Sequence, residues 1–374
     1  MSRLLGTVKE IRSTREGVQE IGVLLENGDV YPAINYTDRL RCLVVGDQVL
    51  LNTTAQQLEL GSGGYHFVIH LMDNSGTLDN PLVRAEGHIM KLRYTPLQHA
   101  VCSVEEEASP HHELFLQDSG LSGMPVLIGE LHSMLPLALC WIQHRVRWNA
   151  YNNVRAPRIV YVMTDAAALP IAWSRHVATL KQMGWLETTI TCGQAYGGQL
   201  EAVNKFSALL AAQAVAHADI CIVTMGPGIV GTGTRLGHSA MEVGEWVNAV
   251  HALGGSPIVM PRISFADSRD RHLGFSHHMF TALKIAALAS ATIPMPSLPS
   301  PEEHAYLLNQ WQNAGLETKH ILCHVPQVLI TDVAVATQLY PEPITSMGRG
   351  LRDDPAFFLG VCAAAETAWT LLND

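Results

Sequence analysis

The chain has 374 residues, of which 48% are hydrophobic and 16% charged, a composition typical of a packed globular protein with two or three domains. Its formal net charge of −10 argues against a general nucleic-acid binder, because phosphate contacts need clustered lysine and arginine. The sequence shows no run of about 18 apolar residues, no signal-peptide core at its start and no CxxC pair among its seven cysteines. These features predict a soluble cytoplasmic protein with neither a membrane nor a nucleic acid as its partner.

The first part of the chain is predicted to form a small antiparallel β-barrel. Short runs rich in valine, isoleucine and leucine are separated by turn signals such as Asn27-Gly28 and Gly46-Asp47. The predicted strands span residues 4–11, 18–25, 29–34, 46–52 and 65–71, and residues 87–94 and 99–105 are expected to add a hairpin. The barrel domain is therefore placed at residues 1–105, and residues 106–120 are expected to form an exposed connection.

From residue 121 to residue 374, apolar runs alternate with helical stretches. Near-continuous valine and isoleucine indicate strands covered on both faces, and their alternation with helices predicts a doubly wound, Rossmann-like α/β domain with a mostly parallel sheet. Strands are predicted at residues 125–129, 157–163, 187–192, 219–225, 256–261 and 320–325. A helix within residues 199–218 is expected to place Leu200, Val203, Phe206 and Leu210 on one face. The last helix lies within residues 353–372, and residues 326–350 show no clear pattern.

Polar side chains follow five of these predicted strands. Ligands bind outside the carboxyl ends of parallel strands, so residues at this edge are candidates for binding or catalysis. The candidates that follow the first three strands are Glu130, His132, Asp165 and Cys192. Cys192 stands at a strand end before a predicted helix, where a lowered pKa would make it a nucleophile. The alternative for Cys192 is that it is a small buried residue, as cysteine commonly is. The alternative for the polar side chains is that they have only structural roles.

A glycine-rich loop follows the strand at residues 219–225. Glycines let the backbone approach a ligand and turn its N–H groups inward, and the next helix adds the positive end of its dipole. The residues assigned to anion binding are Gly226, Gly228, Gly231, Thr232, Gly233, Thr234, Arg235 and, after the next strand, Arg262. The alternative is that the glycines only permit a tight turn and close packing of strand against helix.

The same loop contains the spacing GxGxxG of dinucleotide-binding proteins. In that motif the helix opens within the glycines, and the motif normally follows the first strand of the sheet. Here six further residues intervene before the helix, and the loop follows about the fourth strand. NAD(P) is therefore not the expected cofactor.

A second segment is rich in histidine and aspartate. Asp267, His272, His277 and His278 lie within twelve residues, and a helix that starts after Ser276 would keep the last two histidines neutral in its first turn. Neutral imidazole is the form that acts as a general base or binds a metal. Adjacent histidines on a helix point about 100° apart, so a divalent metal site would use one of them with His272 and a carboxylate. A hydrogen-bonding role in the structure is the alternative.

Several long motifs in this chain resemble those of one protein family. They are TCGQAYGGQLEAVNKFSALLAA, VTMGPGIVGTGTRLG, GEWVNAVHALGG, PRISFADSRDRHLGFSHH, GSGGYHFVIH and SGMPVLIGELHSMLP. The chain is similar through them to an uncharacterised bacterial family known as a domain of unknown function. The resemblance covers most of the chain, the barrel included, and it implies no activity, cofactor or catalytic residue.

Two functions follow from the residues. The first is an enzyme, a hydrolase or group transferase, that binds a small anionic metabolite, such as a phosphorylated one, at the glycine loop. Its acid–base or metal chemistry would come from Asp267, His272, His277 and His278, with Glu130, His132 and Asp165 beside them. The second is a non-catalytic binding or regulatory protein that uses the same cleft. Alanine-rich helices can bury themselves either in the core or across a dimer interface, so the sequence leaves homo-oligomerisation open.

Overall fold

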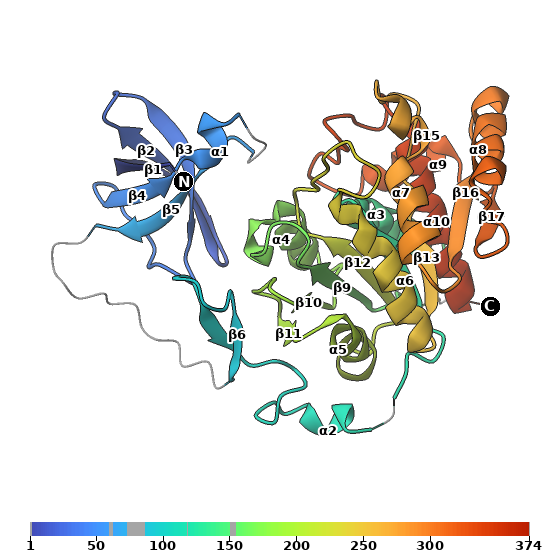
Figure 1. The fold of residues 1–374 in the computed structure, drawn as a ribbon, viewed down its shortest axis with the longest axis horizontal. Helices are drawn as coiled ribbons and strands as arrows, with labels where there is room; N and C mark the ends of the chain where they lie inside the picture. Colours follow the sequence, from blue (N-terminus) through green and yellow to red (C-terminus); the bar gives the residue numbers. More distant parts are fainter. Residues whose placement is uncertain (1, 60–62, 73–86, 118, 150–154, 374) are drawn as a thin grey trace. The chain divides into compact units, whose positions relative to one another are not determined.

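The computed structural model describes residues 2–59, 63–72, 87–117, 119–149 and 155–373 (Figure 1). The chain divides into two compact units, Met1–Arg84 and Ala85–Asp374.

The first unit is a closed five-stranded barrel. Its strands are β1 (Arg3–Arg15), β2 (Val18–Leu25), β3 (Val30–Tyr36), β4 (Gln48–Asn52) and β5 (His66–Leu71), and a short helix, α1 (Thr54–Gln57), precedes β5. They pair in the order β1-β2-β3-β5-β4, and the long strand β1 closes the barrel by also pairing with β4. The β3–β5 pair is parallel, and the other pairs are antiparallel. Val8, Ile21, Val23 and Leu51 fill the interior, so the predicted barrel is confirmed.

The second unit is built on an eight-stranded sheet whose neighbouring strands are all parallel. Its strands are β8 (Pro125–Gly129), β9 (Ile159–Thr164), β10 (Thr188–Cys192), β11 (Leu200–Ala202), β12 (Ile220–Met225), β13 (Ser256–Val259), β16 (Thr292–Pro296) and β17 (Ile321–Val325). They lie in the order β11-β10-β9-β12-β8-β13-β16-β17. All six predicted strands form, and the predicted Rossmann-like α/β architecture is confirmed.

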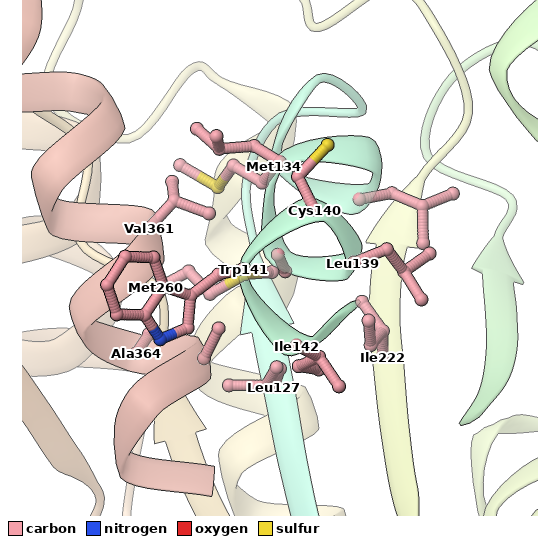
Figure 2. Close-up of a cluster of buried hydrophobic side chains, with 14 of the residues drawn as sticks. Leu127, Met134, Leu139, Cys140, Trp141, Ile142, Ile222, Met260, Val361 and Ala364 are labelled. Carbon is pink, nitrogen blue, oxygen red and sulfur yellow. The ribbon is translucent and has the colours of Figure 1, made fainter. Parts of the chain in front are cut away.

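Helices cover both faces of this sheet (Figure 1). One face carries α3 (Met134–Trp148), α4 (Arg175–Gln182), α9 (Ile330–Thr337) and α10 (Pro355–Asn373). The other carries α5 (Lys205–Leu210), α6 (Glu242–Ala252), α7 (His277–Thr281) and α8 (Pro301–Ala314). Figure 2 shows Trp141 of α3 on the side of that helix that faces α10, where Val361 and Ala364 lie. The Trp141 indole N–H donates to a Glu366 carboxylate oxygen at 2.9 Å, which adds a polar tie to this packing.

Local sequence explains where several helices begin and end. Ser300 caps α8 by accepting from the Glu303 N–H, and Pro301 stands at the first helical position, where its missing N–H costs nothing. The same helix ends at Gly315, which adopts the left-handed conformation that glycine tolerates. Ser276 caps α7 in the same way by accepting from the His278 N–H at 3.2 Å.

Helix α10 is long and apolar enough, by length and composition, to cross a membrane. However, 72% of its most apolar stretch is buried inside the fold, against α3, α9 and the sheet. The helix therefore has the packing of a core helix in a globular unit.

Two parts of the sheet differ from the sequence prediction. Residues 200–202 form β11 and not a helix, and α5 begins only at Lys205. The predicted helical face was wrong, because Val203 and Phe206 are 43% and 46% exposed. The sequence also missed β16, and α9 lies in the stretch 326–350 that showed no pattern.

The predicted hairpin forms from β6 (Ile89–Lys91) and β7 (His99–Val101), and it belongs to the second unit. The sequence had grouped it with the barrel in residues 1–105, and a short helix, α2 (His112–Phe115), lies in the expected connection 106–120. Lys91, in β6, explains why the hairpin belongs to the second unit and not to the barrel. Its buried Nζ donates to the carbonyls of Gly193 and Ala195 at 2.8 and 2.9 Å and lies 3.2 Å from a Glu201 oxygen.

Replacing Lys91 with methionine should lower the free energy of unfolding of the second unit by about 3 kcal/mol or more, because it leaves the Glu201 carboxylate buried without its cation. All seven tryptophans lie in this unit, so tryptophan fluorescence during urea unfolding reports on it alone. The control is Lys284→Met at an exposed position, with an expected change below about 0.5 kcal/mol. Equal effects of the two substitutions would contradict this role of Lys91.

Candidate functional site

The sheet has a topological switch point between β8 and β12. These strands are neighbours, but the chain leaves β8 into α3 on one face and leaves β12 towards α6 on the other. In open parallel sheets such a point opens a crevice at the carboxyl edge, where ligands bind. Glu130 follows β8, the glycine loop follows β12, and Arg262 follows the adjacent β13.

Four histidines gather near this edge, and we call His238, His272, His277 and His278 the histidine cluster. The ring centroids of His238 and His278 are 4.0 Å apart with the planes nearly parallel, and those of His277 and His278 are 4.4 Å apart. His272 completes the group at 4.9 Å from the His278 ring. His238 ends the glycine loop, while a short antiparallel pair, β14 (Ile263–Ser264) and β15 (Gly274–Phe275), brings His272 next to the start of α7.

Three ring nitrogens of this cluster are buried without a hydrogen-bond partner. They are Nδ1 of His238, Nε2 of His277 and Nδ1 of His278. The other nitrogen of His238 lies 3.2 Å from the carbonyl oxygen of Arg235, to which it donates. Because a carbonyl only accepts, this contact fixes the His238 tautomer and leaves Nδ1 with a free lone pair.

The cluster is electrically neutral at pH 7. Burial, followed by the neighbouring histidines and Arg262, lowers the pKa of His278 to about 2. Burial and then Arg262 lower the pKa of His272 to about 3, and the pKa values of His238 and His277 are also lowered, chiefly by burial. Each neutral imidazole therefore has a lone pair, and in His238, His277 and His278 a ring nitrogen without a partner is present for proton transfer or for a metal, whereas Nδ1 of His272 lies 2.9 Å from the Ser276 hydroxyl.

A buried ion pair adjoins the cluster. Arg262 donates to Oε1 of Glu130 at 3.0 Å, and the two side chains are only 5% and 3% exposed. Burial raises the pKa of Glu130, and Arg262 opposes that shift. The same Glu130 oxygen lies 3.9 Å from Nδ1 of His278, and the other carboxylate oxygen has no partner.

Asp267 holds the arginines of this region together. It accepts two hydrogen bonds from the Arg269 guanidinium, at 2.8 and 2.7 Å, and lies 3.4 Å from Arg349 and 3.9 Å from Arg262. These bonds, those from Arg269 first, hold the pKa of Asp267 well below its usual range. Asp267 is therefore a permanent anion that orients the arginines and has no proton to donate.

Three predicted residues lie in other surroundings. His132 is buried, with Nδ1 at 3.2 Å from the Met225 carbonyl and Nε2 at 2.6 Å from the Ser174 hydroxyl, so both of its ring nitrogens are already used. Cys192 is also buried, and burial raises the pKa of its thiol to about 12, which keeps it protonated and not nucleophilic. Asp165 is exposed and accepts from the backbone N–H of Gln194 at 2.9 Å.

The glycine loop bonds extensively to itself. The Thr232 and Thr234 hydroxyls lie 2.9 Å from each other, Thr232 also donates to the Gly237 carbonyl, and Thr234 accepts the Gly237 N–H. Gly228 needs to be glycine because its φ is +112°. A Cβ on Gly231 would stand 3.6 Å from Nε2 of His278, so the loop backbone runs beside the histidine cluster.

Two further residues at this edge, His238 and Glu242, are not among the site residues predicted from the sequence. His238 lies 39 positions from His277, although a histidine directly after a glycine loop that follows a strand is a usable signal. Glu242 opens α6 and accepts from the Thr164 hydroxyl at 2.8 Å. The spacing of Glu242 and Glu245 on one helix favours a solvated face, but burial raises the pKa of Glu242 to about 7.

The histidines that lie close enough to share one ion also differ from those expected. His277 and His278 were expected to diverge too far to share one ion. Each of His238, His277 and His278 offers a ring nitrogen, and these three atoms all lie within 4.8 Å of one another.

The chain matches, over residues 32–365, the family described as "Protein of unknown function (DUF3866)". The chain belongs to this family. The family resemblance seen in the sequence motifs is thereby confirmed. Among curated proteins, no match to this DUF3866 chain was found. The family description names no reaction, so a function has to be argued from the geometry of the site.

The buried His132 should make the stability of this DUF3866 protein depend on pH. Burial lowers its pKa to about 3, so between about pH 3 and pH 6.5 the unfolded chain binds a proton at His132 that the folded chain does not. The free energy of unfolding should therefore fall as the pH falls below 6.5. His132→Gln should reduce this slope by about 1.4 kcal/mol per pH unit in urea unfolding.

His251→Gln, at an exposed position, serves as the control and should keep the wild-type slope. An unchanged slope in His132→Gln would mean that His132 is protonated equally in the folded and unfolded chains.

Proposed function

We propose that this DUF3866 protein is an enzyme, a hydrolase or group transferase, that acts on a small anionic metabolite at the carboxyl edge of the second unit's sheet. One observation carries the proposal: three histidines, each with a buried ring nitrogen that has no partner, lie side by side near a topological switch point. Buried polar atoms are almost always hydrogen-bonded in folded proteins, so several unpartnered ring nitrogens in one cluster call for a ligand or a reacting group.

The half-buried His277 is the best-placed general base. Its neutral ring is more accessible than the other three, and its Nε2 is free to take a proton from water or from a substrate hydroxyl. Burial lowers its pKa first, and His238 and the positive charges of Arg271, Arg262 and Arg269 lower it further. A bound anion would offset those charges and raise the pKa of His277 towards neutral pH, where proton transfer is most efficient.

Two exposed arginines support an anionic substrate. Arg271 acts electrostatically on His277, and Arg235 provides the carbonyl that orients His238. Among the residues that the structure describes, neither arginine forms an ion pair, whereas Arg262, Arg269 and Arg349 are all paired. Their guanidinium groups are thus available to a phosphate or carboxylate. A role for the hydroxyls of Thr232 and Thr234 would require their mutual hydrogen bonds to open.

We further propose that the protein works in the cytoplasm. All seven cysteines are free thiols, which fits a reducing compartment.

The test is a screen of the full chain against phosphorylated and carboxylated metabolites, with products followed by mass spectrometry. His277→Gln should lower kcat on the best substrate by about 100-fold or more, because it removes the base. Arg271→Met should mainly raise KM, since it removes a charge that binds substrate before and during the reaction. The exposed His251→Gln again serves as the control, with unchanged kinetics expected.

Wild-type binding of an anion without turnover would favour the non-catalytic alternative, a binding or regulatory protein. Turnover that is equal in wild type and His277→Gln would reject the assigned base.

A further inference from the structure

We infer that His238, His277 and His278 together hold one divalent transition-metal ion, and that zinc is the ion this ligand set suits best. The inference deepens the proposed function, because the ion would lie in the same site. The lone pair of His277 would then hold the ion, and a water bound to the ion would replace His277 as the group that activates the attack. It depends on that function only for the role of the metal, since binding can be measured without any turnover.

The hydrogen bond of His238 is the first argument. Histidines that bind metals usually donate their other ring N–H to a carbonyl or carboxylate, which fixes the tautomer and the ring orientation. His238 has this arrangement: Nε2 faces the Arg235 carbonyl at 3.2 Å, and Nδ1 is buried without a partner. The nitrogen that a metal needs is therefore the one that no protein group satisfies.

A carboxylate next to the three histidines is the second argument. Glu130 lies 3.9 Å from Nδ1 of His278, and one of its oxygens has no partner. It can accept the N–H of a metal-bound His278 or orient a water molecule on the metal. It also offsets part of the positive charge that an ion would bring into a region already occupied by Arg262.

The third argument is the distance between the ligand atoms. In a tetrahedral zinc site with Zn–N distances of about 2.0–2.1 Å, ligand nitrogens lie about 3.4 Å apart. The three nitrogens here lie within 4.8 Å, so each needs to move by only about 1 Å. Rotation of the imidazoles out of the stack between His238 and His278 supplies such a movement without a change of backbone.

The type of ligand selects the type of ion. Neutral imidazole nitrogen suits zinc and its neighbours in the transition series, whereas magnesium and calcium prefer oxygen. Three histidines leave a fourth coordination position open, as in catalytic zinc sites. An ion there would supply a bound water of lowered pKa, which is the nucleophile that a hydrolase requires.

The experiment measures metal binding by untagged, full-length protein, because a histidine tag would itself bind zinc. The protein is stripped with a chelator and titrated with Zn²⁺, and with Co²⁺ to record the visible spectrum of the bound ion. We expect one equivalent of Zn²⁺ per chain and a Co²⁺ spectrum typical of a tetrahedral site. His238→Gln, His277→Gln and His278→Gln should each weaken binding by more than about tenfold, whereas His251→Gln should bind as wild type does.

Thermal unfolding of each stripped variant separates loss of the ligand from loss of the fold. If a buried variant fails to fold, the half-buried His277→Gln still gives the answer. Absence of stoichiometric Zn²⁺ or Co²⁺ binding, or binding that all three substitutions leave intact, would overturn the inference. Turnover that survives complete metal removal would reject a role of the ion in the reaction but keep the proposed function. Metal binding with no turnover on any substrate would support the metal site and reject the proposed function.

Discussion

The ion pair between Glu130 and Arg262 is the interaction on which the candidate site depends. Withdrawing two such charges from water costs several kcal/mol per ion, so the pair persists only because the partners face each other at 3.0 Å. Its two members follow the ends of the neighbouring strands β8 and β13, so the pair links these two strands at the carboxyl edge of the sheet. The Arg262 carbonyl also accepts the Ser276 N–H at 2.9 Å, which anchors the cap of α7 and with it His277 and His278.

The pair also sets the charge of its surroundings. Arg262 lowers the pKa of His272 and of His278, after burial itself, and so helps to keep the cluster neutral. Glu130 leaves one oxygen unsatisfied and brings the other close to His278. The pair thus contributes to both properties that the proposed chemistry needs: Arg262 adds to the effect of burial in keeping the imidazoles uncharged, and Glu130 places a carboxylate beside them.

Much of this architecture was predictable because long, strongly patterned segments determine it. Five of the six predicted strands are apolar over most of their length, and the strand at residues 187–192 is rich in threonine. The rule that ligands bind at the carboxyl ends of parallel strands brought Glu130, Arg262 and the histidine-rich segment to one edge. Short or atypical strands were not predictable in this way. β16 carries Pro294 and Pro296, which argue against a strand inside a sheet, and β11 has only three residues.

The side-chain level was harder to predict, because burial and partners decide chemistry there. His132 and Cys192 stand at the predicted edge, but both ring nitrogens of His132 are already hydrogen-bonded, and Cys192 is a buried, protonated thiol. His238 belongs to the cluster only because the path of the glycine loop places its ring against His278 of α7, with 4.0 Å between the ring centroids. Sequence spacing cannot supply a contact between residues 39 positions apart that depends on the path of an irregular loop.

The proposed metal site requires that three histidines from two distant segments form one ligand set. A crystal structure of the protein as purified from cells, with anomalous diffraction recorded at the zinc edge, would show whether they do. We expect a single anomalous peak within about 2.1 Å of a ring nitrogen of each of His238, His277 and His278, with the rings turned out of their stack. Three rings in separate surroundings, each hydrogen-bonded to other protein groups and with no shared peak, would contradict it.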